Sequence, residues 1–304
     1  DMSNAGAAAF NSAVTATTFN GIPFYSNSNS MYTHDVSGTE NSASANTAYG
    51  FGAMDAITTG DSNAAIGVNA LGILTTGSRN VAIGHAAGDN LVSGTDNVAV
   101  GYGALSTEDG HGKNVAIGAY TLLNQNAGAD SYNTAVGYAA GNLITTGVQN
   151  TLIGGQAGDA LTSGNSNTAI GYSTLGAETL GDRNVAIGNF ALELQNNTSN
   201  VDVYNTAVGY AAGNAMTTGT LNTIVGGLAG DAITTGISNV AVGYRALSAE
   251  DAHGQNVAVG SFALAAQDAG TDAYNVAVGA SAGSAITTGT NNTLIGGLAG
   301  DALT

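Results

Sequence analysis

The chain has 304 residues, and its formal net charge of -17 reflects 21 Asp and Glu side chains against four Lys and Arg. A protein that binds a nucleic-acid backbone needs clustered Lys and Arg, so this balance argues against a nucleic-acid partner. The sequence contains no Cys, which excludes disulfides and thiolate sites. No apolar run approaches the length that spans a bilayer, so we expect no membrane insertion by this segment.

The first 45 residues form a separate segment without a repeat. Small and β-prone residues alternate over residues 1–20, and the only Pro of the chain, Pro23, indicates a turn or a strand edge. We therefore expect residues 1–45 to be a short β-rich connector that leads into a second domain, residues 46–304.

Residues 46–304 are built from one phrase, Asn-(Thr/Val)-Ala-(Val/Ile)-Gly, and its close variants. Successive phrases are 17 residues apart, except for two steps of 19 and one of 21. The fifteen copies begin at Asn46, Asn63, Asn80, Asn97, Asn114, Asn133, Asn150, Asn167, Asn184, Asn205, Asn222, Asn239, Asn256, Asn275 and Asn292. This period predicts an all-β fold, a parallel β-solenoid or β-roll with 17 residues in most coils. We expect the array to continue beyond Thr304, because the last coil resembles the others and is not a distinct cap.

Within a coil we number positions from the opening Asn, and the alternation of a strand then assigns each position to a face. Val81 and Ile83, at positions 2 and 4, share one face, which we expect to be buried. Asn80, Ala82 and Gly84 form the smoother opposite face. Two strands of about five residues and two turns account for the length of a coil and leave no room for a helix.

Two positions serve as structural anchors of the repeat. The Asn at position 1 predicts either a ladder of amide hydrogen bonds between stacked coils or simply a residue that tolerates the turn. Gly occupies position 5 in all fifteen coils, which predicts a backbone conformation closed to other residues or a close approach by another chain. Representative anchors are Asn80, Gly84, Asn97, Gly101, Asn133, Gly137, Asn150 and Gly154.

A longer rhythm of four coils lies on top of the basic period. The enlarged coils end at Tyr132, Tyr204 and Tyr274, and position 12 is apolar in the first two coils of a block and polar in the last two. Where position 3 is large, as at Leu152, position 6 is Gly, as at Gly155, which indicates a crowded seam. Because so short a coil buries few side chains, we expect the Ala and Gly rows to form the seam of an intertwined homotrimer.

Two turns in the third coils of their blocks share a Glu-Asp-x-His pattern. Their candidate metal ligands are Glu108, Asp109, His111, Glu250, Asp251 and His253. Three copies of either turn around a trimer axis could hold a divalent cation through carboxylates and imidazole, and the alternative is a solvated acidic turn. The corresponding turn, residues 178–181, lacks both Asp and His. We identify no catalytic residues and no organic cofactor site.

Tyr recurs at position 6, for example at Tyr102 and Tyr138. An exposed row of Tyr could stack on sugar rings, whereas a buried row would fill the seam between chains. The size swap between positions 3 and 6 favours the seam.

The phrase Asn-(Thr/Val)-Ala-(Val/Ile)-Gly, followed by a small residue at position 8, resembles the head repeats of trimeric autotransporter adhesins. That resemblance implies left-handed parallel β-rolls intertwined as trimers. Turns such as residues 141–147 also resemble repeats in tail fibres of marine bacteriophages, and residues 1–11 are similar to junction segments of those fibres. The 17-residue coil is longer than is usual in the adhesin heads, which favours the fibre.

The expected function is therefore that of a structural, receptor-binding extracellular fibre without enzymatic activity. The resemblance points to a phage tail fibre that attaches the virion to a host surface. A trimeric autotransporter adhesin on a bacterial surface is the alternative, and a polysaccharide-cleaving fibre is a third possibility. The expected partners are two identical chains and a glycan or protein receptor on the host or another cell.

Overall fold

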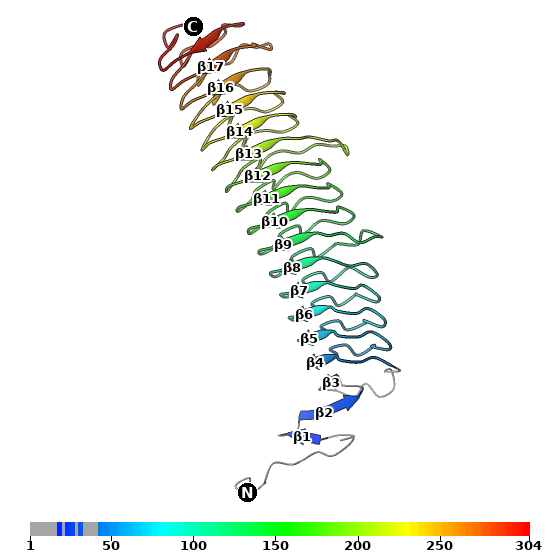
Figure 1. The fold of residues 1–304 in the computed structure, drawn as a ribbon. Helices are drawn as coiled ribbons and strands as arrows, with labels where there is room; N and C mark the ends of the chain where they lie inside the picture. The colour runs from blue at the N-terminus through cyan, green and yellow to red at the C-terminus, as the bar shows by residue number, and fades with distance from the viewer. Residues whose placement is uncertain (1–16, 20–21, 28–29, 33–41) are drawn as a thin grey trace, which may run out of the picture.

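The protein is a long stack of coils. The computed structural model describes residues 17–19, 22–27, 30–32 and 42–304, which include no helix and so form an all-β structure (Figure 1). The predicted parallel β-solenoid with 17 residues in most coils is confirmed for residues 46–304. The junction-like segment, residues 1–11, lies outside the described residues.

In the described part of residues 1–45, three strands precede the repeats. Strands β1 (Thr17–Phe19), β2 (Ile22–Asn27) and β3 (Ser30–Tyr32) pair in antiparallel order, β1 with β2 and β2 with β3. Strand β3 then pairs in parallel with the first strand of the repeats, so the connector adds its last strand to the same sheet. Pro23 lies inside β2, opposite Thr18 of β1.

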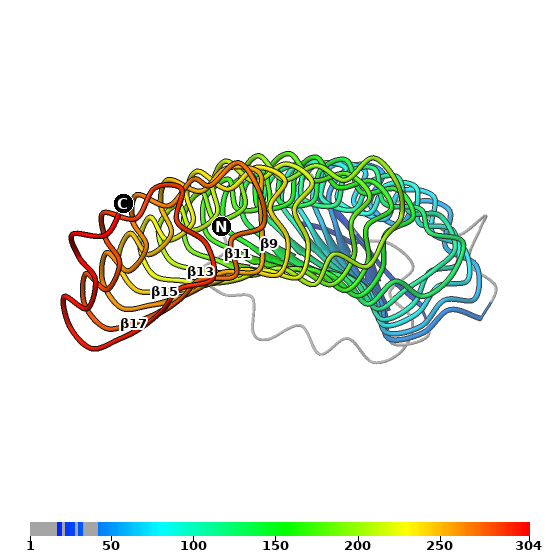
Figure 2. The same cartoon turned by 90° about the horizontal axis from the view of Figure 1, so that it is seen from above.

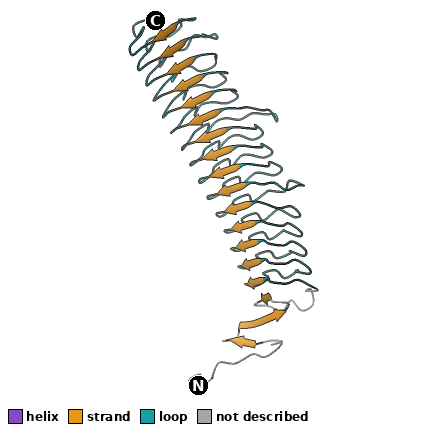
Figure 3. Ribbon diagram, in the orientation of Figure 1, coloured by secondary structure: helices purple, strands orange, loops and turns teal. Residues whose placement is uncertain are grey.

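Each of the fifteen coils contributes one strand of three residues, at positions 2 to 4 (Figure 3). Every strand pairs in parallel with the next, so that Val81 lies beside Val98 and Ile83 beside Val100. The strands are β4 (Thr47–Tyr49), β5 (Ala64–Ile66), β6 (Val81–Ile83), β7 (Val98–Val100), β8 (Val115–Ile117), β9 (Thr134–Val136), β10 (Thr151–Ile153), β11 (Thr168–Ile170), β12 (Val185–Ile187), β13 (Thr206–Val208), β14 (Thr223–Val225), β15 (Val240–Val242), β16 (Val257–Val259), β17 (Val276–Val278) and β18 (Thr293–Ile295).

The prediction of two strands per coil is wrong, since positions 6 to 17 of the described coils form turns. The reason lies in the backbone, which adopts the left-handed conformation at three places in a coil. In the coil that opens at Asn184 these are Phe190, Leu192 and Tyr204, with φ of 62°, 50° and 53°. Left-handed residues interrupt an extended chain, so one edge of the coil is a strand and the rest is a succession of turns.

The prediction of which strand face is buried is also wrong. Ala82 is fully buried, whereas 40% of Ile83 is exposed. The inside of the coil is narrow and holds the small position-3 side chain, the Asn of position 1, and buried residues of the return path such as Ala87 and Leu91. The Ala rows therefore pack within one chain and are not a seam between chains.

Gly at position 9 makes room in the core for large side chains at positions 3 and 12. Coils with Gly at position 9, such as Gly158, have a large apolar residue at position 12, here Leu161. A Cβ on Gly158 would lie 2.8 Å from Leu161 Cδ1 and 2.9 Å from Leu152 Cδ2. Gly155 at position 6 instead faces outward, beside the ring of Tyr172. The large side chain of Leu152 is thus accommodated by the glycines at position 9 and not by Gly155.

The Asn side chains form the predicted ladder. Asn150 Oδ1 accepts the backbone N–H of Asn167 at 2.9 Å, and Asn150 Nδ2 donates to Asn133 Oδ1 at 3.2 Å and to the carbonyl of Gly164 at 2.9 Å. In most coils the amide therefore ties its strand both to the neighbouring coil and to the returning turn of its own coil. The side chains are buried, which makes these bonds costly to leave unmade.

We expect Asn150→Ala to lower the free energy of unfolding by about 2 kcal/mol, because it leaves the buried N–H of Asn167 and the carbonyl of Gly164 without partners. The measurement is the urea midpoint followed by circular dichroism. Asn90 is the matched control, since it is exposed and its backbone does not adopt the left-handed conformation. Equal shifts for Asn150→Ala and Asn90→Ala would show that the ladder contributes nothing specific.

Two of the three enlarged coils carry a cation, a carboxylate and a Tyr at the enlarged turn, whereas in the third Gln255 replaces the cation and donates to Asp272. Lys113 Nζ bonds to Asp130, donates to Tyr132 Oη at 3.0 Å and lies 5.0 Å from the centre of the Tyr132 ring. The second enlarged coil repeats the arrangement with Arg183 and Tyr204. These groups are exposed, so they set the shape of the turn more than they add stability. The loops before β9 and β13 project furthest from the stack in Figure 1.

Seen along the stack, successive coils are rotated and offset, so the array follows an arc (Figure 2). At the usual strand spacing, fifteen coils extend for about 70 Å. The strand edge of the coil forms one continuous surface along this length.

Candidate functional site

The polar residues at position 12 lie inside the solenoid. Glu108, Glu178 and Glu250 occupy this position in the third coil of their blocks, and all three are fully buried. A buried carboxylate is costly unless hydrogen-bond donors surround it. The sequence indicates a polar flank at these positions, but the structure places three acids in the interior.

Glu178 is completely surrounded by donors. Its Oε1 accepts the backbone N–H groups of Thr179, Leu180, Gly181 and Asn197 at 2.8–3.1 Å. Its Oε2 accepts Gln195 Nε2 at 2.8 Å and Asn197 Nδ2 at 2.9 Å. The longest coil, of 21 residues, supplies Asn197, so its extra length brings the donors that this acid needs.

Glu108 and Glu250 lack this support. Glu250 Oε1 accepts the backbone N–H of His253 at 3.1 Å, but Glu250 Oε2 and His253 Nδ1 are buried without a hydrogen-bond partner. Glu108 and His111 show the same pattern, with a backbone N–H bond of 3.1 Å and two unpartnered atoms. In both cases the amide of the next position-1 Asn, Asn114 or Asn256, is also left without an acceptor.

Burial controls the titration of these two acids. It raises the pKa of Glu250 to about 7, and the bond from the His253 N–H and the charge of His253 oppose this rise. Burial likewise raises the pKa of Glu108, against the bond from the His111 N–H. The two carboxyls are therefore poised to gain from any positive charge placed beside them.

The predicted ligands of each turn lie together in a single chain. We call the first set the N-terminal cluster: Glu108, Asp109 and His111. We call the second set the C-terminal cluster: Glu250, Asp251, His253 and Asp268. Within each cluster, one possible ligand atom per residue lies within 4.8 Å of the others. A trimer axis is not needed to assemble either set.

Sequence analysis misses Asp268, which reaches the C-terminal cluster from the adjacent coil. It stands at position 13 of the coil that opens at Asn256, directly after the buried Gln267. The repeat does contain a signal for Asp268: in a stack of coils, position 13 of one coil lies beside the turn of the preceding coil. The matching residue of the N-terminal cluster is Asn126, which explains why that set has three members.

The outer surface carries a row of aromatic rings. Tyr102 and Tyr138 are 50% and 59% exposed, so in the single chain the Tyr of position 6 lies outside and fills no internal space. Neighbouring rings are in contact, with centroid distances between 5.1 and 6.0 Å. The aromatic row consists of His85, Tyr102, Tyr120, Tyr138, Tyr172, Phe190, Tyr210, Tyr244 and Phe262.

Beside this row runs the outward face of the sheet, made of positions 2 and 4, which we call the apolar strand face. Ile66, Ile83 and Ile117 are 44%, 40% and 38% exposed, and nearly every coil adds a Val or Ile to the stripe. The Val and Ile side chains of position 4 run along about 70 Å of the stack, and position 2 adds Val in some coils and Thr in others, so the apolar stripe covers roughly 300–500 Å². This is within the range of the largest apolar patches on monomeric proteins.

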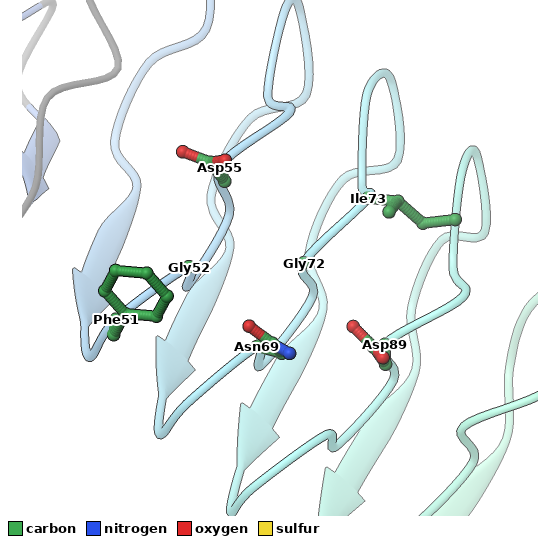
Figure 4. A pocket seen from close by; sticks show the side chains of 7 residues that line it. All are labelled: Phe51, Gly52, Asp55, Asn69, Gly72, Ile73 and Asp89. Atoms are coloured by element: carbon green, nitrogen blue, oxygen red, sulfur yellow. The ribbon is translucent and has the colours of Figure 1, made fainter.

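A shallow depression of about 480 Å³ lies over the turns of the first three coils (Figure 4). It contains none of the predicted ligands. Its lining residues are Phe51, Gly52, Asp55, Asn69, Gly72, Ile73 and Asp89.

No protein-family model matches the chain, and neither the curated proteins nor the solved structures compared with it give a match. Among the residues that the structure describes, no helix has the length and apolar character needed to cross a membrane.

Proposed function

We propose that the chain is a non-catalytic segment of an extracellular fibre, namely a phage tail fibre that attaches the virion to a host surface. The observation that carries this proposal is the uninterrupted in-register stack of fifteen coils. Such a ladder gives a stiff rod, and its repeated turns offer many equivalent weak contacts whose combined strength can be large. The net charge of -17 fits a solvent-exposed rod.

We further propose that two identical chains complete the rod as a homotrimer. The apolar strand face and the aromatic row support this, because together they form an apolar stripe along the array, although the row of rings is interrupted at Gly155 and Gly227. A threefold assembly would cover all three stripes around one axis. We therefore propose that the seam between chains lies on the outward strand face and not on the Ala rows that the sequence suggests.

The oligomeric state is measured by light scattering after size exclusion. We expect three times 29.6 kDa, or 88.8 kDa, for the unmodified chain. Ile117→Asp should yield monomers, because it places a charge on the apolar strand face. Ile73→Asp is the matched control: Ile73 is 44% exposed but lies on a turn, away from this face. A stable monomer with unchanged β structure would refute the trimer.

The location of the fibre is tested with antibodies raised against the array and detected by electron microscopy. Labelling of tail fibres on virions is the expected result. Labelling of bacterial envelopes would instead select the adhesin. Absence of label from both surfaces would contradict an attachment role altogether.

A further inference from the structure

The three third-type coils of the complete blocks provide an internal comparison. Each buries a Glu at position 12, yet only Glu178 has donors for both oxygens. In that coil the residues that correspond to Asp251 and His253 are Thr179 and Gly181, which offer no metal ligand of comparable strength. The coil that satisfies its Glu internally has therefore lost the other members of the cluster.

Glu250 is in the opposite situation, since it keeps the neighbouring ligand groups but lacks donors for one oxygen. Its Oε2 is buried without a hydrogen-bond partner, and one of its two oxygens lies within 4.8 Å of a ligand atom of each of three further residues. An unpaired buried oxygen of this kind costs free energy, and a cation bound there would remove the cost. The Nδ1 atom of His253 is also unpartnered and lies 3.7 Å from Glu250 Oε1. A carboxylate oxygen and an imidazole nitrogen this close favour a positive charge beside them, which either a proton or a metal ion supplies.

The donor set defines the class of cation. Three carboxylates with one imidazole make a mixed oxygen and nitrogen set, which suits first-row divalent metals such as Zn²⁺ better than Ca²⁺, which prefers oxygen ligands alone. The ligands come from one turn and from Asp268 of the following coil. A bound ion would thus join two successive coils at the point where the coil length changes.

We propose that the C-terminal cluster binds one divalent transition-metal cation, with Zn²⁺ as the expected ion. The N-terminal cluster offers one carboxylate fewer, because Asn126 stands where the C-terminal cluster has Asp268. It binds the same class of ion more weakly. At Glu250 the metal takes the role that the donors Gln195 and Asn197 have at Glu178.

The test is calorimetric titration of the chelator-treated full chain with Zn²⁺. We expect one dominant site per chain, weakened at least about tenfold by Asp268→Asn and by His253→Ala. Asp159→Asn is the charge-matched control and should leave the affinity unchanged, since Asp159 belongs to neither cluster. Absence of Zn²⁺ binding, or binding that both cluster variants leave intact, would overturn the proposal.

A second experiment adds a ligand and does not depend on the folding of a damaged site. Asn126→Asp completes the N-terminal cluster, so the titration should then show two sites of similar affinity per chain. Co²⁺ added to the unmodified chain should give visible absorption bands of a site with nitrogen and oxygen ligands. A single unchanged site in Asn126→Asp together with a featureless Co²⁺ spectrum would contradict the assignment.

Discussion

Replacing Gly154 with Ala is expected to destabilise the array by roughly 3 kcal/mol, combining the strain of an unfavourable backbone conformation with overpacking. Gly154 has φ of +138°, which side chains rarely adopt. An added Cβ would also meet the backbone of the next coil, where the carbonyl carbon of Gly171 would lie only 2.6 Å away. Neither strand can move aside without breaking the ladder on both sides.

The neighbouring residue provides the control for this prediction. Gly155 lacks the positive φ, and a Cβ there would touch the Tyr172 ring at an ordinary 3.5 Å. Gly155→Ala should therefore change the free energy of unfolding, measured by urea denaturation, by less than about 0.5 kcal/mol. If Gly154→Ala and Gly155→Ala lose the same free energy of unfolding, the close approach of successive coils does not explain the Gly at position 5.

The period of the sequence was sufficient to predict the solenoid, because each Asn and each Gly performs the same local task in every coil. Gly84 shows that the close approach belongs to the next coil of the same chain, at Gly101. The two possible roles of Asn are resolved by the bonds of Asn150 to Asn133 and Asn167. These features depend on residues about one period apart, which a repeat makes visible.

The alternation of residues along the strand did not predict which strand face is buried. Val81 and Ile83 are more apolar than Ala82, so burial by hydrophobicity alone selects the wrong side. The width of the coil decides the outcome, because the interior also has to accommodate Ala87 and Leu91 from the return path. That width follows from left-handed backbone in non-Gly residues, for which the sequence carries no clear signal.

The candidate site was predictable in its composition but not in its environment. The pattern of Glu250, Asp251 and His253 is visible in the sequence, whereas the burial of Glu250 is not. A polar residue at position 12 normally indicates solvent. Here Leu247 at position 9 and Glu250 at position 12 are both fully buried, so the acid is enclosed in the interior.

This difference in environment leads to the second large effect, a contrast between two identical substitutions. Glu178→Gln should destabilise the chain by about 3 kcal/mol, because either orientation of the new amide turns its NH₂ group toward at least two donors. Glu250→Gln should change stability by less than about 1 kcal/mol in the presence of chelator, since the amide can occupy the position of the unpartnered Oε2.

Urea unfolding of both variants, with and without Zn²⁺, separates the two kinds of buried acid. The loss in Glu178→Gln should be the same in either condition, because its six bonds come from the protein itself. The loss in Glu250→Gln should appear only when Zn²⁺ is present, because the unmodified chain alone then gains from the ion. A large, Zn²⁺-independent loss in Glu250→Gln would mean that its carboxylate is held by protein donors, as in Glu178. Glu178 and Glu250 occupy the same position of their coils, so the comparison shows whether hydrogen-bond donors or a cation balance the buried charge.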